Sequence, residues 1–181
     1  MDLSATLKGT EIIIDGILYN TKNENDRRFI GLYQERRLLT YLINKNIKIE
    51  HISNENKYNC YDFIIRHSEG TNDMIYIIEL KSRLGVIDNH TYELMSYSKI
   101  QKYKKICNNY KNTTNTNVKC IFIFNHINTD DNNSNDYYYY EIDFKKLEDV
   151  CFRIITDYSI TYQLPIRHLK PLDTFIEYLQ K

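Results

Sequence analysis

Two short runs of β-branched and aromatic residues, separated by a polar turn, most constrain what this chain can fold into. The first run is Tyr61–Arg66 and the second is Met74–Arg83, with Glu69–Asp73 between them. Runs of this composition on either side of a turn that contains Gly and Asn are typical of a β-hairpin. The pattern therefore predicts two paired antiparallel strands.

Charged residues at one end of this hairpin suggest chemistry. Glu79 and Lys81 are two residues apart, so their side chains point to the same face of the second strand. Asp62 belongs to the first strand, where pairing can bring its carboxylate beside Glu79. Paired carboxylates are the oxygen ligands that hard divalent cations prefer, and a lysine next to such a cation can orient or activate a water. We therefore expect a divalent-cation site at this end of the hairpin.

These residues resemble the motif of the PD-(D/E)xK nuclease superfamily, the restriction-endonuclease-like proteins. The matching positions are Asp62 and the triplet Glu79-Leu80-Lys81, while Tyr61 stands in place of the proline, which carries none of the chemistry. The resemblance covers about residues 27–124. It implies an α/β fold with an αβββαβ core, in which helices flank a central mixed sheet. An N-terminal hairpin and C-terminal helices would be added to this core within one domain of residues 1–181.

A helix is predicted over Arg27–Asn46, with Asp26 as its N-cap. Its apolar arc recurs at the helical period and consists of Leu32, Leu38, Leu39, Leu42 and Ile43. Glu35 projects into this arc, and a carboxylate on an apolar face needs a partner or a cation. The resemblance implies that Glu35 belongs to the active site. The alternative is a structural ion pair with a basic neighbour such as Arg36 or Arg37.

A second helix is predicted over His90–Tyr110. Its apolar arc consists of Met95, Ile100, Tyr103, Ile106, Cys107 and Tyr110. Lys99 falls within this arc, and buried lysines are rare without a partner. The resemblance implies a lysine or glutamine on this helix facing the Glu-x-Lys strand, for which Lys99 is the first candidate and Gln101 the second. Alternatively, Lys99 extends along the apolar face to solvent.

The remaining elements are shorter. Asp15-Gly16 between apolar runs predicts an N-terminal hairpin, and Ile47–Ile52 predicts an edge strand. The nearly continuous apolar run Val118–Phe124 is typical of a strand buried on both faces. A mobile polar loop is predicted over Asn125–Asp136. After it we expect a strand over Tyr137–Asp143 with its tyrosines on a solvated face, a helix within Phe144–Tyr158, and a last helix started by Pro171.

The resemblance also implies roles for the site residues. Mg²⁺ or Mn²⁺ would be bound by Asp62, Glu79 and the backbone carbonyl of Leu80, with Glu35 binding a second ion or a water held by the first. Lys81 would contact the attacking water and the scissile phosphate, and Lys99 would add positive charge beside the phosphate.

The distribution of charge favours nucleic acid as the partner, although the formal net charge is zero. Residues 81–120 carry eight Lys and Arg against two Asp and Glu, whereas residues 121–181 carry six against ten. A locally basic middle is typical of a surface that contacts phosphates. We expect DNA contacts from Arg83, Lys102, Lys104 and Lys105, and the alternative is a solvated lysine-rich helix.

Other classes of function find little support. The four cysteines show no CxxC spacing, and the five glycines form neither a P-loop nor a dinucleotide fingerprint. The sequence shows no signal peptide or long apolar span, so we expect an intracellular protein, cytoplasmic or nuclear, with no membrane partner. A homodimer is left open as its assembly state. A Glu-Leu-Lys triplet followed by a lysine-bearing helix is similar to compact nucleases of large DNA viruses. We therefore predict a metal-dependent DNA endonuclease. The alternative is a catalytically inactive nucleic-acid- or protein-binding module on the same fold.

Overall fold

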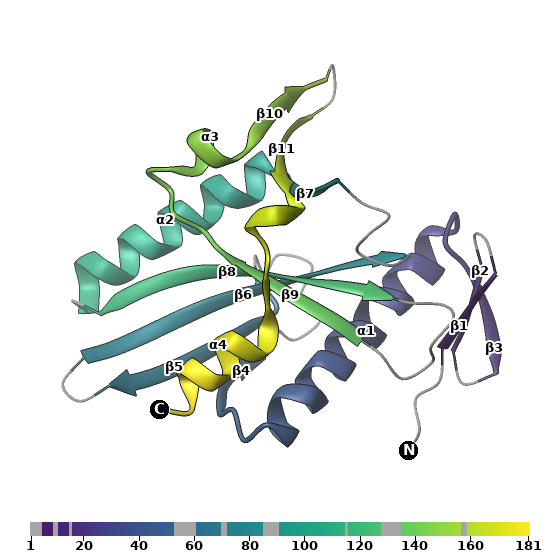
Figure 1. Ribbon diagram of the computed structural model, residues 1–181, viewed down its shortest axis with the longest axis horizontal. Coiled ribbons are helices and arrows are strands. Elements are labelled where there is room, and N and C mark those ends of the chain that lie inside the picture. The colour runs from purple at the N-terminus through teal and green to yellow at the C-terminus, as the bar shows by residue number, and fades with distance from the viewer. Residues whose placement is uncertain are drawn as a thin grey trace.

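A computed structural model describes residues 5–8, 11–14, 16–52, 61–69, 72–84, 91–114, 116–127, 135–156 and 159–181. Its centre is a six-stranded mixed sheet flanked by helices, which confirms the expected α/β class (Figure 1). The strands lie in the order β12 (Lys170–Pro171), β9 (Asn135–Glu141), β8 (Asn117–Ile127), β6 (Asn72–Leu84), β5 (Phe63–Glu69) and β4 (Ile49–Ile52). The pair β6–β8 is parallel and the other pairs are antiparallel.

The predicted hairpin is present as β5 and β6, and β4 is an edge strand as expected. β8 is buried on both faces, but it continues through Asn125, His126 and Ile127, which were expected to begin a loop. Asn125 is buried there and its side-chain amide donates a 2.8 Å hydrogen bond to Gln34. This polar partner explains how an asparagine is accommodated inside a central strand.

The helices cover opposite faces of the sheet (Figure 1). Because side chains alternate along β6, Ile75 and Ile77 pack in the core that includes α2 (Tyr97–Thr114). Tyr76 and Ile78 pack in the opposite core with α1 (Glu24–Asn44) and α4 (Leu172–Leu179).

Two cysteines belong to the core that includes α2. Cys107 and Cys120 are buried there as expected, with their sulfur atoms 3.2 Å apart, and both are free thiols.

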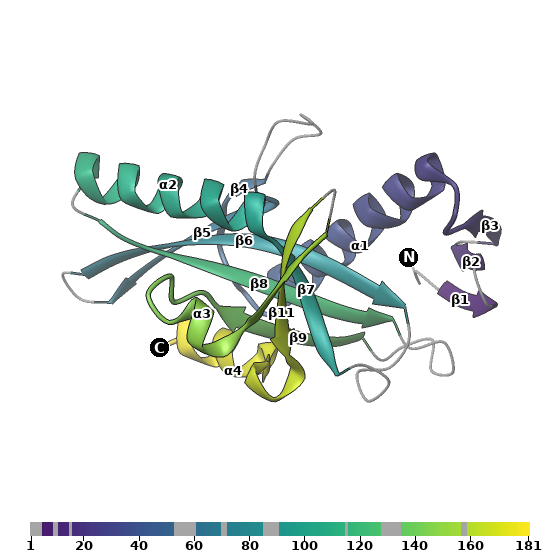
Figure 2. The ribbon, with the colours of Figure 1, turned by 90° about the horizontal axis from the view of Figure 1, so that it is seen from above.

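The N-terminal hairpin is part of a three-stranded antiparallel sheet, β1 (Ala5–Lys8), β2 (Glu11–Ile14) and β3 (Ile17–Asn20), that adjoins the start of α1 (Figure 2). Gly16 has a φ of 81° in the connection between β2 and β3, a conformation that glycine adopts without steric cost. Asp15 lies outside the described residues.

The first helix begins earlier than its pattern indicated. Asn23, not Asp26, is its N-cap, and the Asn23 side chain accepts hydrogen bonds from the N–H groups of Asn25 and Asp26. Asp26 instead accepts a 2.7 Å hydrogen bond from the N–H of Asn20. The inclusion of Ile43 in the buried arc was also wrong, because its side chain is 55% exposed.

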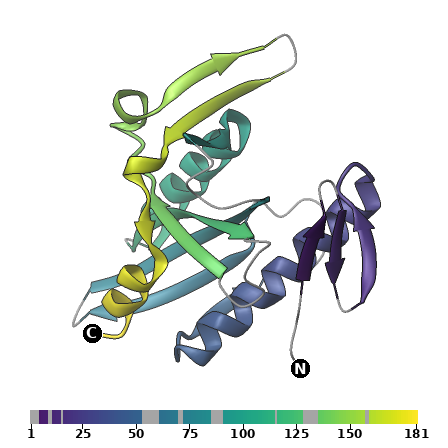
Figure 3. The same ribbon diagram turned by 45° about the vertical axis from the view of Figure 1, so that its right-hand side comes forward.

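Two helical predictions were wrong because they fell on strands that pair with the same third strand. Tyr92–Ser96, expected in the second helix, forms β7, and Phe152–Ile155 forms β10. Both pair with β11 (Ile160–Pro165) in a separate three-stranded sheet, whose β10–β11 hairpin extends away from the central sheet (Figure 3). Of the helix expected within Phe144–Tyr158, the structure has only the single turn α3 (Leu147–Val150).

The C-terminal elements follow the sequence more closely. Pro171 is the N-cap of α4, which begins one residue later than its pattern indicated. A one-turn 3₁₀ helix, η2 (Ile166–His168), precedes it. On β9 the prediction of a solvated tyrosine face was wrong for Tyr137, which is buried. Among the residues that the structure describes, no helix combines the length and the apolar character needed to cross a membrane.

Candidate functional site

Among the described residues, the carboxyl end of β6 has an open edge. Pairing with β5 ends where Phe63 faces Ile78, whereas pairing with β8 continues to Leu84. Within the described part of the chain, β6 beyond Ile78 therefore has a strand neighbour on one side only. The N–H of Asp62 still bonds to the carbonyl of Ile78 at 2.9 Å, so Asp62 lies at the point where the two strands separate.

Backbone geometry fixes the Asp62 carboxylate at this edge. Its Oδ2 atom accepts a 2.7 Å hydrogen bond from the N–H of Leu80. The N–H and C=O groups of one strand residue point to the same edge, so the Leu80 carbonyl also faces the open side. A carboxylate and a backbone carbonyl are thus directed into the same space.

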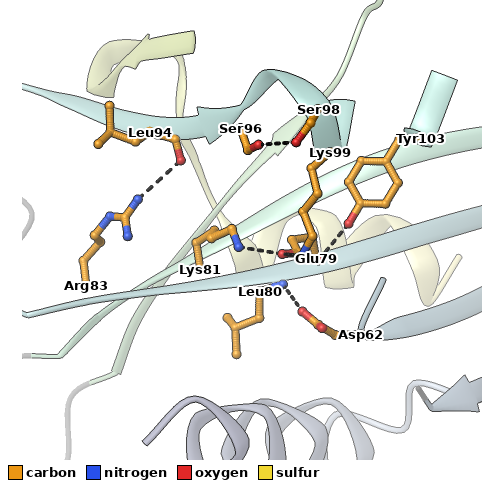
Figure 4. Close-up of polar contacts among 10 residues, drawn as sticks. All are labelled: Asp62, Glu79, Leu80, Lys81, Arg83, Leu94, Ser96, Ser98, Lys99 and Tyr103. Atoms are coloured by element: carbon orange, nitrogen blue, oxygen red, sulfur yellow. Dashed lines mark hydrogen bonds and ion pairs between the residues drawn. The ribbon is translucent and has the colours of Figure 1, made fainter. Parts of the chain in front are cut away.

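Glu79 is the centre of the polar cluster (Figure 4). Its side chain is only 2% exposed, and its Oε1 atom accepts hydrogen bonds from Lys81 at 2.6 Å and from Lys99. Its Oε2 atom accepts a 2.7 Å hydrogen bond from the hydroxyl of Tyr103. Lys99 and Tyr103 are four residues apart on α2, so both reach Glu79 from one face of that helix. The buried carboxylate is fully paired, as burial of a charge requires.

One pocket of about 450 Å³ joins this cluster to the first helix. Its lining includes every residue expected to act in the chemistry, namely Glu35, Asp62, Glu79, Leu80, Lys81 and Lys99. Glu35 reaches it from α1, and none of the ion pairs between described residues joins Glu35 to Arg36 or Arg37. Lys99 is paired with Glu79 and is not directed only to solvent, while Gln101 lines a different pocket.

Burial and neighbouring carboxylates raise the pKa of two acidic side chains in the pocket, Asp62 and Glu35. Burial, and then the negative charges of Glu79 and Glu35, raise the pKa of Asp62 to about 7, against the opposing effects of the Leu80 hydrogen bond and Lys99. Burial and Glu79 likewise raise the pKa of Glu35, while Lys99 and Lys81 oppose the shift. Burial and Glu79 also raise the pKa of Tyr103 far above its usual range, so its hydroxyl stays protonated and donates to Glu79. A positive charge placed among these carboxylates would be stabilised.

The donor set fits a hard divalent cation in kind, since it offers carboxylate oxygens and a backbone carbonyl. With the present side-chain positions, no three His, Cys, Asp or Glu side chains of the described residues are arranged to hold a metal ion. The ammonium groups of Lys81 and Lys99 both lie on Oε1 of Glu79. A cation that used this oxygen would therefore have to displace them.

Arg83 lies next to the site but is bound to another element. Its guanidinium donates a 2.9 Å hydrogen bond to Glu93 and a 3.3 Å hydrogen bond to the carbonyl of Leu94, both on β7. Glu93 is 1% exposed and also lies 3.1 Å from the imidazole of His126, so Arg83 supplies charge to a buried carboxylate. This is a structural role for Arg83, and its contact with DNA stays a prediction.

The other expected DNA contacts, Lys102, Lys104 and Lys105, are exposed on α2 and do not line the pocket that holds Glu79. Lys104 lines a different pocket, beside α3. A role for these three lysines in DNA binding also stays a prediction.

Some residues of the site were not recognised from the sequence. Tyr103 was assigned only to an apolar arc, although its spacing of four from Lys99 places both on one helix face. Arg27 and Gly31 line the pocket with Glu35. These three residues are spaced by four along the helix, and this spacing was the feature of the sequence that could have placed them on one face.

Comparison with models of known protein families and with curated proteins finds no match to this sequence.

Proposed function

We propose that this protein is a metal-dependent endonuclease that hydrolyses phosphodiester bonds of DNA. The observation that carries the proposal is the convergence of three carboxylates, two lysines and the Leu80 backbone on one pocket at the open edge of β6. Grouping carboxylates at the end of an apolar hairpin opposes stability, because burial and like charge disfavour their ionised forms. The cost is understandable if the cluster binds a cation and acts on an anionic substrate.

The residues that would hold the metal are Asp62 and Glu79, together with the carbonyl of Leu80. When bound, Mg²⁺ or Mn²⁺ would supply Lewis acidity and the positive charge that phosphodiester hydrolysis requires. Glu35, which lines the pocket from α1, would bind a second ion or orient a water.

The lysines would act on the substrate. When the ammonium groups of Lys81 and Lys99 leave Glu79, they remain in the pocket as cations for the non-bridging oxygens of the scissile phosphate. Lys81 lies on the same strand as Glu79 and is the residue we assign to the attacking water as well. Preorganised donors of this kind contribute about 10²–10³-fold to rate.

The order of elements supports the PD-(D/E)xK family and its restriction-endonuclease-like core as part of the proposal. Helix α1, strands β4, β5 and β6, helix α2 and strand β8 follow one another in that order, with β7 inserted before α2. The parallel pairing of β6 and β8 across α2 is compatible with this core. Such an enzyme would act on DNA inside a cell. If it is a viral nuclease, as the resemblance to compact nucleases of large DNA viruses implies, that cell would be the infected host.

The decisive experiment is a cleavage assay with purified protein. The substrates are duplex, single-stranded, nicked and four-way-junction DNA and a matching RNA, each with Mg²⁺, with Mn²⁺ and with EDTA. We expect metal-dependent cleavage of DNA. Lys81→Ala should lower it by about 100-fold or more while DNA binding stays close to wild type, because one phosphate contact is lost among several.

The matched control is Lys111→Ala, which removes an exposed lysine from the last turn of α2 and should leave cleavage unchanged. If the wild type cuts none of these substrates with either metal and Lys81→Ala binds them as the wild type does, the nuclease proposal fails. The inactive binding module is then the better description.

A further inference from the structure

The wall that α1 contributes to the pocket has an unusual composition. Arg27, Gly31 and Glu35 are spaced by four residues, so they lie on one face of the helix, and all three line the pocket. This wall therefore presents a guanidinium, a gap where a side chain would be, and a carboxylate, in that order along the helix.

Nothing among the described residues requires glycine at position 31. It lies inside α1, where glycine is less stable than alanine because the unfolded chain has more conformational freedom. Its φ is not positive, so no special backbone conformation requires it. A Cβ atom added at Gly31 would meet no atom of the described residues within 4 Å, so no close packing requires it either.

The missing side chain leaves the pocket open beside α1. The pocket volume of about 450 Å³ falls within the range of roughly 300–1,000 Å³ that is usual for ligand sites. Arg27 is exposed, and none of the ion pairs between described residues includes it. An unpaired guanidinium beside an open helix face suits an anionic, extended ligand, since arginine matches phosphate geometry with two parallel hydrogen bonds.

We propose that Arg27 and Gly31 bind the sugar–phosphate backbone of the substrate strand, which crosses α1 at Gly31 while Arg27 holds a phosphate next to the scissile one. This inference rests on the proposed nuclease function and adds the path of the strand through the site. Glycine permits the close approach, because any larger side chain would occupy the space that the strand needs.

The test compares Gly31→Ala and Gly31→Leu with Thr40→Leu, which places the same leucine side chain at an exposed position of α1 outside the pocket. Gly31→Ala should raise the midpoint of thermal unfolding, which shows that the helix tolerates a side chain. Gly31→Leu should lower kcat/KM by about tenfold or more, mainly through a higher KM, and Thr40→Leu should not. The tenfold change in kcat/KM corresponds to the loss of at least one favourable contact between the protein and a phosphate of the strand.

The second arm measures binding of fluorescein-labelled duplex and single-stranded DNA at several salt concentrations. Arg27→Ala should reduce the slope of log affinity against log salt by about one unit, and Arg28→Ala, which removes an exposed neighbour outside the pocket, should reduce it less. If the wild type cleaves DNA and Gly31→Leu keeps its KM and kcat, the strand path is wrong and the nuclease proposal stands. If the wild type cleaves nothing, the binding assay alone tests the strand path. The strand path is then wrong if wild type, Gly31→Leu and Arg27→Ala bind DNA with equal affinity.

Discussion

Asp62→Asn should make the metal-free protein more stable at pH 8. The substitution removes the charge of a carboxylate that lies beside Glu79 and Glu35 in the pocket. It keeps the side-chain shape, and the amide oxygen of asparagine can still accept the hydrogen bond from the N–H of Leu80. The change in stability therefore reports the charge rather than the loss of a contact.

The magnitude follows from the pKa. The pKa of Asp62 rises from its usual 3.8 to about 7 in the folded protein, which corresponds to at most about 4 kcal/mol of destabilisation when the group is ionised. Asp62 lines an open pocket and is only partly buried, so solvent screening reduces this figure. We expect Asp62→Asn to gain about 2 kcal/mol at pH 8, or roughly 4–8 °C in Tm for a chain of this size.

The sign depends on pH. Between the unfolded pKa of 3.8 and the folded pKa of about 7, the folded protein binds more protons than the unfolded chain. The contribution of Asp62 to stability is therefore complete below 3.8, is lost as pH rises to about 7 and stays lost above it. The variant lacks this dependence, so the difference in Tm between variant and wild type should grow across that interval and then level off.

The assay is thermal unfolding from pH 4 to pH 8.5 in EDTA, with Asp149→Asn as a control because that carboxylate is exposed. The control should change stability by less than about 0.5 kcal/mol. Adding Mg²⁺ or Mn²⁺ at a hundred times the dissociation constant should raise the free energy of unfolding of the wild type by about 2.7 kcal/mol and so raise its Tm. The Tm of Asp62→Asn should rise much less. Equal stability of wild type and Asp62→Asn at pH 8, with parallel pH profiles, would refute the clustered-carboxylate reasoning.

Two further variants test the partners of Glu79. Tyr103→Phe keeps the packing of the ring but removes the hydroxyl that donates to Oε2 of Glu79. The affinity for Mn²⁺, measured by calorimetry, should therefore fall about 10–100-fold. An unchanged affinity would mean that Tyr103 does not orient this carboxylate. Lys99→Ala removes one of the two ammonium groups on Glu79 and should lower kcat less than Lys81→Ala does. If Lys99→Ala only lowers the Tm and activity per folded molecule is unchanged, the side chain serves packing alone.

Local periodicity determined the parts of the site that lie within single elements. The period of two along a strand placed Glu79 and Lys81 on one face of β6, and both contribute to the same cluster. The helical period placed Lys99 and Glu35 on faces that meet the pocket. The central strands were predictable for the same reason, because continuous apolar runs such as that of β8 have no stable position except a buried one.

Pairing between distant segments decided the rest. Residues 92–96 are compatible with helix or strand, and only β11, about seventy residues later, provides the hydrogen bonds that make them β7. Glu93 can be buried there because Arg83 and His126, which pair with it, come from two other strands, β6 and β8. Asp62 takes its position because β5 stops pairing with β6 at Phe63 and exposes the Leu80 amide. The sequence alone determined which faces carry the charged groups, whereas the tertiary structure decided which groups meet, since a contact between faces depends on partners that no local pattern specifies.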